Sequence, residues 1–337
     1  MTKGNLVSVI IPVFNTEEYV ARCLDSLIGQ THDNLEIIVI VDASPDRSVD
    51  IVKKYIKNDS RIKLIQLNEN IGSFHARIKG MHKMRGQYFT MIDSDDYVDT
   101  NFIKSLLDEA LKNNAEITLS DGYISVDEYG NKHKMTFPDL IKSPHPFQNF
   151  MSGVASQKYG WGVLGKLYKY SLFEQSKAFF NHINEKIIMG DDIIYMTFFT
   201  FFAKKVSRVN DEHGYNYYQN PDSVTNNQNT SESYKRYICD IFQVMVEIER
   251  FLVRNDLEKK YRKELLEFRR WQIGYLTDDI YLHNSREIDL KNTEIRAKNH
   301  EIEQLKDEKQ KIVNSKTYKL GSAITAPVRL LRSITKK

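Results

Sequence analysis

The chain has 337 residues, of which 41% are hydrophobic and 28% charged, and its formal net charge is +3 at pH 7. A chain of this length can bury a sizeable core and form more than one folding unit. The near-neutral charge gives no indication of a nucleic-acid partner, and the two cysteines, Cys23 and Cys239, do not indicate a disulfide framework.

Neither a targeting segment nor a membrane span is predicted. The residues before Val7 lack the basic, apolar and cleavage regions of a signal peptide, so we expect none. The longest strongly apolar window, residues 196–203, is shorter than the roughly 20 residues that span a bilayer. We therefore expect a cytoplasmic protein, or one bound peripherally to the inner face of the cell membrane.

The first half of the chain alternates between strand and helix patterns. Apolar runs typical of buried strands lie at residues 7–11, 37–41, 61–67, 88–92 and 116–119. Apolar stripes with helical spacing lie at residues 19–28, 49–56, 74–84 and 99–113. This alternation predicts an α/β domain with a mostly parallel, Rossmann-like sheet that helices cover on both faces.

Polar residues follow the predicted strands at the point where each strand ends. Asn15, Asp42 and Asn70 follow the first three strands, and Asp93 follows the fourth. The carboxyl ends of parallel strands meet at one rim of the sheet, and open α/β sheets bind ligands at that rim. The sequence therefore predicts a nucleotide-binding crevice there.

Three carboxylates crowd the end of the fourth strand, at Asp93, Asp95 and Asp96. Such close carboxylates repel each other unless a cation or hydrogen-bond donors offset their charge. Mg²⁺ and Mn²⁺ prefer oxygen ligands and commonly bridge protein carboxylates to substrate phosphates. The stretch indicates either a metal–diphosphate site or a solvated acidic turn before the next helix, and the motif alone does not separate the two.

The middle of the chain mixes short elements with turns. Residues 123–134 alternate around a hairpin turn at 129–131, and residues 145–151 can begin a short helix. A stretch rich in glycine and aromatic residues follows at 160–168. Asp191 and Asp192 then open a strongly apolar helix, where they can be reactive groups or simply favourable charge at a helix N-terminus. Short strands are predicted at 206–209 and 215–219.

The C-terminal third is predicted to be helical. Residues 234–282 show a continuous helical pattern, and apolar residues recur every seven positions at Ile288, Ile295 and Ile302. This half-filled heptad predicts a short coiled coil or an exposed single helix. Residues 314–337 interleave apolar residues with lysines and arginines and contain no acidic residue. Such a tail suits an anionic membrane surface, and the alternative is a disordered solubilising tail.

Four motifs give the first half a resemblance to a known family. They are the stretch at residues 9–15, the turn Asp42-Ala43-Ser44-Pro45-Asp46, the stretch Asp93-Ser94-Asp95-Asp96, and Gly190-Asp191-Asp192. In this order and at this spacing the chain resembles the bacterial family 2 glycosyltransferases with the GT-A fold, of the kind that act in capsule, teichoic acid or other cell-surface polysaccharide synthesis. Lys166-Leu167-Tyr168 and Ser223-Val224-Thr225 fit the same pattern.

Four positions depart from the family's pattern. Val41 replaces a residue that is usually polar, and Ala43 replaces a residue that is usually glycine. Ile78 stands where asparagine usually follows Arg77. Tyr218 stands where relatives often carry a basic residue near the diphosphate. None of these departures removes a carboxylate that the chemistry requires.

The resemblance implies an inverting, metal-dependent hexosyl- or N-acetylhexosaminyl-transferase that uses a UDP-sugar donor and a glycan or lipid-linked glycan acceptor. It implies that Asp192 is the catalytic base and that Asp95, with Asp93, binds Mn²⁺ or Mg²⁺. The remaining residues that the resemblance places at the donor are Pro12, Phe14, Asn15, Asp42, Arg77 and Ser94. Asp191, Trp161 and Tyr168 are candidates for the acceptor side, and the two aromatic residues can equally be core residues.

The resulting organisation has four parts. They are a GT-A domain at 1–225, a helical module at 231–284 that can support a homo-oligomer, a charged helix or short coiled coil at 285–313, and a basic amphipathic membrane-associating tail at 314–337. The sequence argues strongly against a dinucleotide-binding oxidoreductase, because the first strand does not run into G-x-G-x-x-G. A nucleotidyltransferase and a non-catalytic nucleotide-sugar-binding scaffold stay open as alternatives, and the sugar, linkage and acceptor are not predicted.

Overall fold

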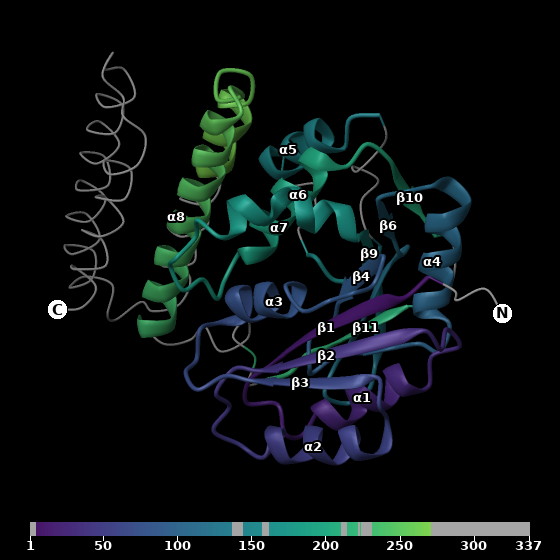
Figure 1. Ribbon diagram of the computed structural model, residues 1–337. Coiled ribbons are helices and arrows are strands. Elements are labelled where there is room, and N and C mark those ends of the chain that lie inside the picture. Colours follow the sequence, from purple (N-terminus) through teal and green to yellow (C-terminus); the bar gives the residue numbers. More distant parts are fainter. Residues whose placement is uncertain are drawn as a thin grey trace. The chain divides into compact units, whose positions relative to one another are not determined.

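A computed structural model describes residues 5–136, 144–156, 162–209, 214–221, 223 and 231–270 (Figure 1). The chain divides into two compact units, Met1–Thr230 and Ser231–Lys337. The predicted charged helix at 285–313 and the tail at 314–337 lie outside the described residues, so these two predictions stay predictions.

Strands and helices alternate through the first unit, as Figure 1 shows. The strands are β1 (Val7–Val13), β2 (Leu35–Val41), β3 (Ile62–Gln66), β4 (Tyr88–Met91), β5 (Tyr97–Val98), β6 (Ile117–Leu119), β7 (Gly122–Val126), β8 (Lys132–Thr136), β9 (Lys166–Lys169), β10 (Val206–Arg208) and β11 (Tyr215–Tyr218). The helices are α1 (Val20–Ile28), α2 (Ser48–Asn58), α3 (Ser73–Met81), α4 (Phe102–Asn113), α5 (Pro146–Ala155), α6 (Tyr170–Phe180) and α7 (Asp191–Phe202).

The described strands form a seven-stranded sheet in the order β10-β6-β9-β4-β1-β2-β3. All pairs in it are parallel except those of β9, which runs antiparallel to both β4 and β6. The prediction of a mostly parallel α/β sheet is therefore confirmed. The sequence did not reveal β9 or α6, because β9 is a four-residue strand that lacks an apolar run.

Both faces of the main sheet are covered by helices. Alternate residues of β1 and β2 pack into one core with α1, α2 and α4, and α3 lies on the opposite side of the sheet (Figure 1). Gly80 allows that approach, because a Cβ there would lie 2.6 Å from the Ile40 side chain and 2.8 Å from that of Ile10. The burial of β1 and β2 on both faces explains why their sequences are almost continuously apolar.

A second sheet brings a late segment of the chain back to the rim of the first. Its order is β5-β11-β7-β8, and β7 and β8 form the predicted hairpin around residues 129–131. β11 pairs antiparallel with β5, which directly follows the acidic stretch at 93–96. As a result, residues 215–220 lie beside that stretch although more than a hundred positions separate them in sequence.

The described part of the second unit is helical, as the sequence predicts, and a turn interrupts it. α8 (Ser231–Arg254) ends where Asp256 adopts a left-handed conformation with φ 56°. Leu257 N donates to Leu252 O and Asp256 N to Val253 O, the paired bonds of a Schellman cap. Asn and Asp tolerate this conformation better than most residues, and the chain turns here for that reason. In the part of the chain that the structure describes, no helix has the length and apolar character needed to span a bilayer.

Glu36 on β2 is a buried carboxylate that joins neighbouring segments at the end of the sheet opposite the polar rim. It accepts hydrogen bonds from Ser8 Oγ and Lys63 Nζ, each at 2.7 Å, and from the backbone N–H groups of Arg85 and Gly86. Burial opposes its charge, but these donors outweigh burial and lower its pKa from 4.5 to about 2. The ionised form is therefore the one that the fold stabilises.

We expect Glu36→Gln to lower the free energy of unfolding at pH 7 by about 2–3 kcal/mol, the value of a depression of this size after allowance for solvent screening. Because the folded pKa is depressed, this contribution is complete above pH 4.5 and is lost as pH falls toward 2. Urea unfolding of wild type and variant at pH 7 and pH 3 measures it. An equal difference at both pH values would contradict the assignment.

Candidate active site

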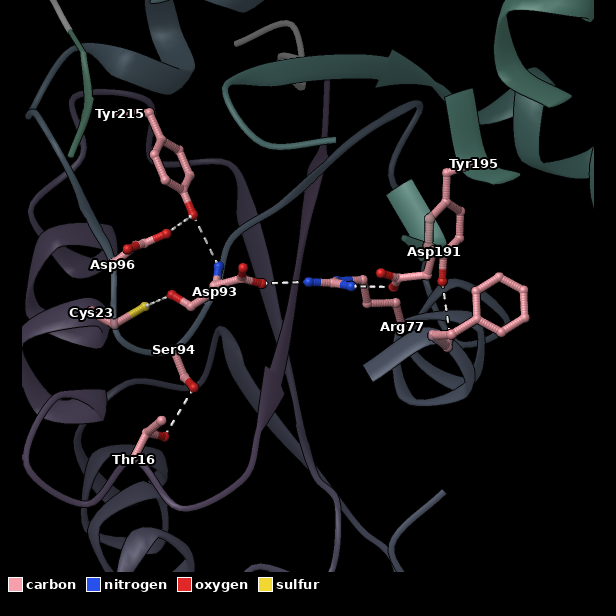
Figure 2. A network of polar contacts seen from close by, with 10 residues as sticks. Thr16, Cys23, Arg77, Asp93, Ser94, Asp96, Asp191, Tyr195 and Tyr215 are labelled. Carbon is pink, nitrogen blue, oxygen red and sulfur yellow. Dashed lines mark hydrogen bonds and ion pairs between the residues drawn. The ribbon is translucent and has the colours of Figure 1, made fainter. Parts of the chain in front are cut away.

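The acidic loop, which we define as residues 93–96, leaves the main sheet at its centre, because β4 lies between β1 and β9. The loop is a tight turn in which Asp96 N donates to Asp93 O at 3.1 Å. The hydroxyl oxygens of Ser94 and Thr16 lie 2.9 Å apart, which ties the loop to the residues that follow β1 (Figure 2). The predicted donor residue Ser94 therefore lies beside the first strand, as the rim prediction requires.

Asp96 is a structural member of this loop. It is fully buried and accepts hydrogen bonds from Tyr215 Oη at 2.5 Å and from Tyr218 N at 2.8 Å. The same Tyr215 hydroxyl accepts a hydrogen bond from Asp93 N at 3.1 Å (Figure 2). Asp96 and Tyr215 thus bind the acidic loop to β11.

Asp95 is a carboxylate whose negative charge is poorly offset. Its Oδ2 accepts a hydrogen bond from Asn220 Nδ2 at 3.1 Å. Burial and the neighbouring charge of Asp93 raise the pKa of Asp95, and the Asn220 bond opposes that change. A group in this state gains from a nearby cation, because a positive charge favours the ionised form.

Arg77 links the acidic loop to the first turn of α7. Its two terminal nitrogens contact Asp93 Oδ1 and Asp191 Oδ2, each at 2.6 Å, and its side chain is 7% exposed (Figure 2). Burial opposes the charge of Arg77, but the two carboxylates outweigh burial and raise its pKa well above the usual value. This bridge joins two motifs that are about a hundred residues apart in sequence.

Asp191 and Asp192 form the first turn of α7, and their carboxyl groups differ in their contacts. Asp191 is held by Arg77, and burial raises its pKa to about 6 against the lowering effect of that arginine. Burial and the charge of Asp191 raise the pKa of Asp192 to about 7. A carboxylate with a pKa near neutral is suited to take and release a proton.

Asp42 and Asn15 shape the rim on the other side of β1. Asp42 is buried and accepts hydrogen bonds at 2.8 Å from the backbone N–H groups of Ile71 and Gly72, where the chain turns into α3. Asn15 has a left-handed conformation with φ 55°, and its N–H donates to Ser44 Oγ at 2.8 Å. Both residues therefore lie at one rim, as the sequence predicts. The hydrogen bonds by which Asp42 holds the 71–72 turn were not predicted.

Phe14 is an exposed aromatic side chain at this rim. It directly follows the last residue of β1 and is 47% exposed, whereas Pro12 lies within β1. An exposed aromatic ring next to Asn15 offers a flat surface on which a planar base can stack. Pro12, Phe14 and Asn15 are therefore brought together by the end of one strand.

The match to a family model decides the affiliation of the chain. The model described as glycosyl transferase family 2 matches residues 8–178, about half of the chain and most of the main sheet. The chain belongs to glycosyl transferase family 2.

Curated relatives of this family 2 chain include other bacterial glycosyltransferases. The glycosyltransferase GlyA of Streptococcus pneumoniae is 31% identical over 209 residues, which are 58% of this chain and 30% of GlyA. EpsJ of Bacillus subtilis, described as an uncharacterized glycosyltransferase, is 31% identical over 224 residues, which are 65% of this chain and 63% of EpsJ. The matched part of the chain spans less than two thirds of either relative.

A solved structure shares the fold. The crystal structure of residues 1–349 of S. aureus TarS matches with a TM-score of 0.61 at 21% identity, and the match covers 83% of this chain and 76% of that one. The same protein in complex with UDP-GlcNAc matches with a TM-score of 0.63. The GT-A fold that the sequence predicts for this family 2 chain is confirmed.

The acidic loop fits the divalent cation that the family resemblance implies. Within the described ranges no three His, Cys, Asp or Glu side chains gather into a complete protein-only metal site. Mg²⁺ sites on nucleotide substrates use one or two carboxylates and take their other ligands from phosphates and water. Asp95, with its raised pKa, and its neighbour Asp93 supply carboxylates of the required kind.

The two aromatic residues predicted for the acceptor side have different outcomes. Trp161 lies outside the described residues. The prediction for Tyr168 is wrong, because its side chain is fully buried among Phe89, Phe199 and Met196 and its hydroxyl donates to Val163 O. The alternative that the sequence left open, a core aromatic residue, describes Tyr168.

Sequence reasoning missed Tyr215 and Arg22, and it named Lys166 only as part of the family's pattern, without a role. Tyr215 holds the acidic loop, and Lys166 is buried beside the turn that precedes β9. Arg22 of α1 donates to Asp95 O at 2.8 Å, and its guanidinium lies 4.7 Å from the ring centre of Tyr97 and 4.4 Å from that of Tyr218. A polar or charged residue inside an apolar pattern is the sequence signal that marks Arg22 and Lys166.

Proposed function

We propose that this chain is an inverting glycosyltransferase that moves a sugar from a UDP-sugar to a hydroxyl group of a glycan acceptor in bacterial cell-surface polysaccharide synthesis. The observation that carries the proposal is the Arg77 bridge, which places the first turn of α7 beside the acidic loop. TarS, which shares the fold, has been crystallised with UDP and with UDP-GlcNAc. That choice of ligand supports a uridine nucleotide here.

The rim of β1 and β2 is proposed to bind the nucleoside. Phe14 offers a ring for stacking, and Asn15 and Asp42 offer polar groups beside it. Asp42 already accepts two backbone hydrogen bonds, but an ionised carboxylate has about four acceptor positions and can accept a further bond from the base. The diphosphate would then lie over the acidic loop, toward Ser94.

Asp192 is proposed to act as the general base. Its carboxylate removes the proton of the acceptor hydroxyl while that oxygen forms a bond to the anomeric carbon. The bond from the anomeric carbon to the diphosphate oxygen breaks on the opposite face, and the leaving UDP keeps the electron pair, so the configuration inverts. The proton stays on Asp192, whose pKa near 7 allows it to be released afterwards.

Asp95 and Asp93 are proposed to hold Mn²⁺ or Mg²⁺. A divalent cation bound there supplies charge neutralisation for the leaving diphosphate. Arg77 keeps Asp93 oriented, and Asn220 does the same for Asp95. These contacts fix the carboxylates before the donor arrives, which reduces the ordering that binding must otherwise impose.

A nucleotide-sugar panel tests the function. Thermal stability would be measured with UDP, UDP-glucose, UDP-galactose, UDP-GlcNAc and UDP-GalNAc, with and without Mn²⁺, and GDP and ADP would serve as nucleotide controls. We expect Mn²⁺-dependent stabilisation by UDP compounds and release of UDP from the preferred donor. Binding without UDP release would favour the scaffold alternative, and pyrophosphate formation from UTP and a sugar phosphate would favour a nucleotidyltransferase.

Asp95→Asn is expected to weaken Mn²⁺-dependent UDP binding while the fold is retained. The substitution keeps the size of the side chain but removes the charge that a cation requires. We expect a loss at least as large as the roughly 10–100-fold that follows removal of an outer-shell partner of a metal. Calorimetric titration of UDP at several Mn²⁺ concentrations measures it, and unchanged Mn²⁺ dependence would remove Asp95 from the proposed ligand set.

The tail at 314–337 is proposed to hold the enzyme at the inner face of the membrane, where a lipid-linked acceptor would be reached. Its alternating basic and apolar residues motivate this, since each basic residue near an anionic surface contributes about 1 kcal/mol. We expect a chain truncated after Asn314 to lose co-sedimentation with vesicles that contain phosphatidylglycerol. Equal sedimentation of both chains would exclude the tail as the anchor.

A further inference from the structure

Lys166, the first residue of β9, is a fully buried lysine that the proposed mechanism does not use. Its ammonium group donates hydrogen bonds to the carbonyl oxygens of Gly162 and Leu164, the latter at 3.2 Å. Burying a lysine is costly, and such a residue persists when its donors are satisfied and its charge is used. Both of these hydrogen bonds go to the turn that precedes Lys166.

We call residues 162–165 the Gly162 turn. Its four successive carbonyl groups all accept hydrogen bonds from the core of the domain. Lys166 Nζ donates to Gly162 O and Leu164 O. Tyr168 Oη donates to Val163 O at 3.0 Å, and Ser120 N donates to Gly165 O at 2.9 Å. The turn is therefore fixed along its whole length, with Lys166 as the one charged donor among these bonds.

The Gly162 turn lies against the carboxylate of Asp192. A Cβ built on Gly162 would be 3.7 Å from Asp192 Oδ2, which is ordinary contact distance. The backbone of Gly162 therefore forms a wall beside the proposed base, and a methyl group added to Gly162 would contact the Asp192 carboxylate. Since Gly162 does not have a left-handed φ, this position also tolerates alanine.

Lys166 also belongs to the charges that surround Asp192. Those charges are Asp191 on the same helix, Asp93 of the acidic loop, Arg77 of α3 and Lys166 of β9. The two acids disfavour the ionised form of Asp192, and the two bases favour it. Burial lowers the pKa of Lys166 to about 7, Asp192 opposes that change, and Arg208 of β10 adds to it.

We propose that Lys166 is a positioning residue for the acceptor side of the site: it fixes the Gly162 turn as the wall beside Asp192 and stabilises the ionised Asp192 carboxylate. This proposal rests on the proposed function, in which Asp192 is the base. It takes the region beside Gly162 as the place where the acceptor hydroxyl arrives. It adds two residues, Lys166 and Gly162, to the residues that govern the acceptor step.

Lys166→Met tests the charge, because methionine has a similar length and donates no hydrogen bond. We expect UDP affinity in Mn²⁺ to change less than about 2-fold, and turnover of UDP-GlcNAc with water as acceptor to fall roughly 10- to 100-fold, the range for a misplaced catalytic group. Tyr168→Phe is the matched control. It removes an uncharged hydrogen bond from the same turn and isolates the loss of turn rigidity from the loss of charge.

The titration of Asp192 gives a readout that does not depend on turnover. Carbon-13 NMR of aspartate-labelled protein, with Asp192→Asn for assignment, reports the midpoint of its carboxyl group. Since Lys166 favours the ionised form, we expect Lys166→Met to raise that midpoint by about half a pH unit or more. Tyr168→Phe should leave it at the wild-type value, and equal midpoints in all three proteins would overturn the electrostatic role.

Gly162→Ala tests the wall in a variant that keeps every hydrogen bond of the turn. The added methyl group would contact Asp192 Oδ2 and obstruct the approach of the acceptor hydroxyl, so we expect turnover to fall with unchanged UDP affinity. If Gly162→Ala turns over at the wild-type rate, the proposal is overturned, even if Lys166→Met does not fold. If the wild-type protein releases no UDP from any donor, the proposed function has failed instead. The titration midpoint of Asp192 would then still decide the role of Lys166.

Discussion

Asp192→Asn is expected to lower sugar transfer by about 10²–10⁴-fold, the usual contribution of a positioned general base. Asparagine has the shape of aspartate but cannot take up the proton of the acceptor hydroxyl. Donor binding should survive, because the terminal nitrogens of Arg77 contact Asp93 and Asp191, so the substitution leaves this bridge in place. Initial rates of UDP release, measured beside UDP affinity in Mn²⁺, separate the two effects.

Asp191→Asn is the matched control for that experiment, since it alters the neighbouring carboxylate of the same helical turn. This variant loses the ion pair with Arg77 and should therefore be less stable, whereas Asp192→Asn should unfold like the wild type. A near-normal rate in Asp192→Asn, with a large loss in Asp191→Asn, would transfer the role of base to Asp191.

The local patterns of the sequence predict most of the fold because the main sheet is buried on both faces. The continuous apolar runs of β1 and β2 have this origin, and the helical stripes match the faces of α1, α2 and α4 that pack against the sheet. β9 was missed since its four residues include the buried Lys166, which has no place in an apolar pattern. Its stability comes from its neighbours β4 and β6, and a sequence window does not include these.

For the site as well, the local sequence predicts some features, and others depend on contacts between distant segments. The rim positions of Asn15, Asp42 and Asp93 follow from strand ends alone, and the structure places them as expected. The partners of these residues do not follow, since they come from distant segments. Tyr215 reaches the acidic loop through the pairing of β11 with β5, and the two carboxylates of the Arg77 bridge lie on different elements.

Arg77→Met is expected to be the most damaging single substitution for the integrity of the site. It leaves Asp93 and Asp191 without their shared cation, and removal of one partner from a buried ion pair typically costs 3–5 kcal/mol. Because Asp93 is 28% exposed, we expect the lower end, about 3 kcal/mol, which in a domain of this size corresponds to a fall in melting temperature of roughly 6–12 °C. Thermal unfolding measured at pH 7 tests this value.

Two further variants separate the bridge from the charge of Arg77. Arg77→Lys keeps the charge but lacks the two terminal nitrogens that contact Asp93 and Asp191 at once, so its stability should be intermediate. In the Arg77→Met background, Asp191→Asn should restore part of the stability, because it removes the uncompensated buried charge. Additive effects of the two substitutions in this double-mutant cycle would show that the pair is not coupled. Coupling would mean that the acidic loop and the first turn of α7 depend on one arginine for their charge balance. UDP binding and base activity should then decline together in Arg77→Met. Asp95→Asn should lower UDP binding alone, and Asp192→Asn should lower base activity alone.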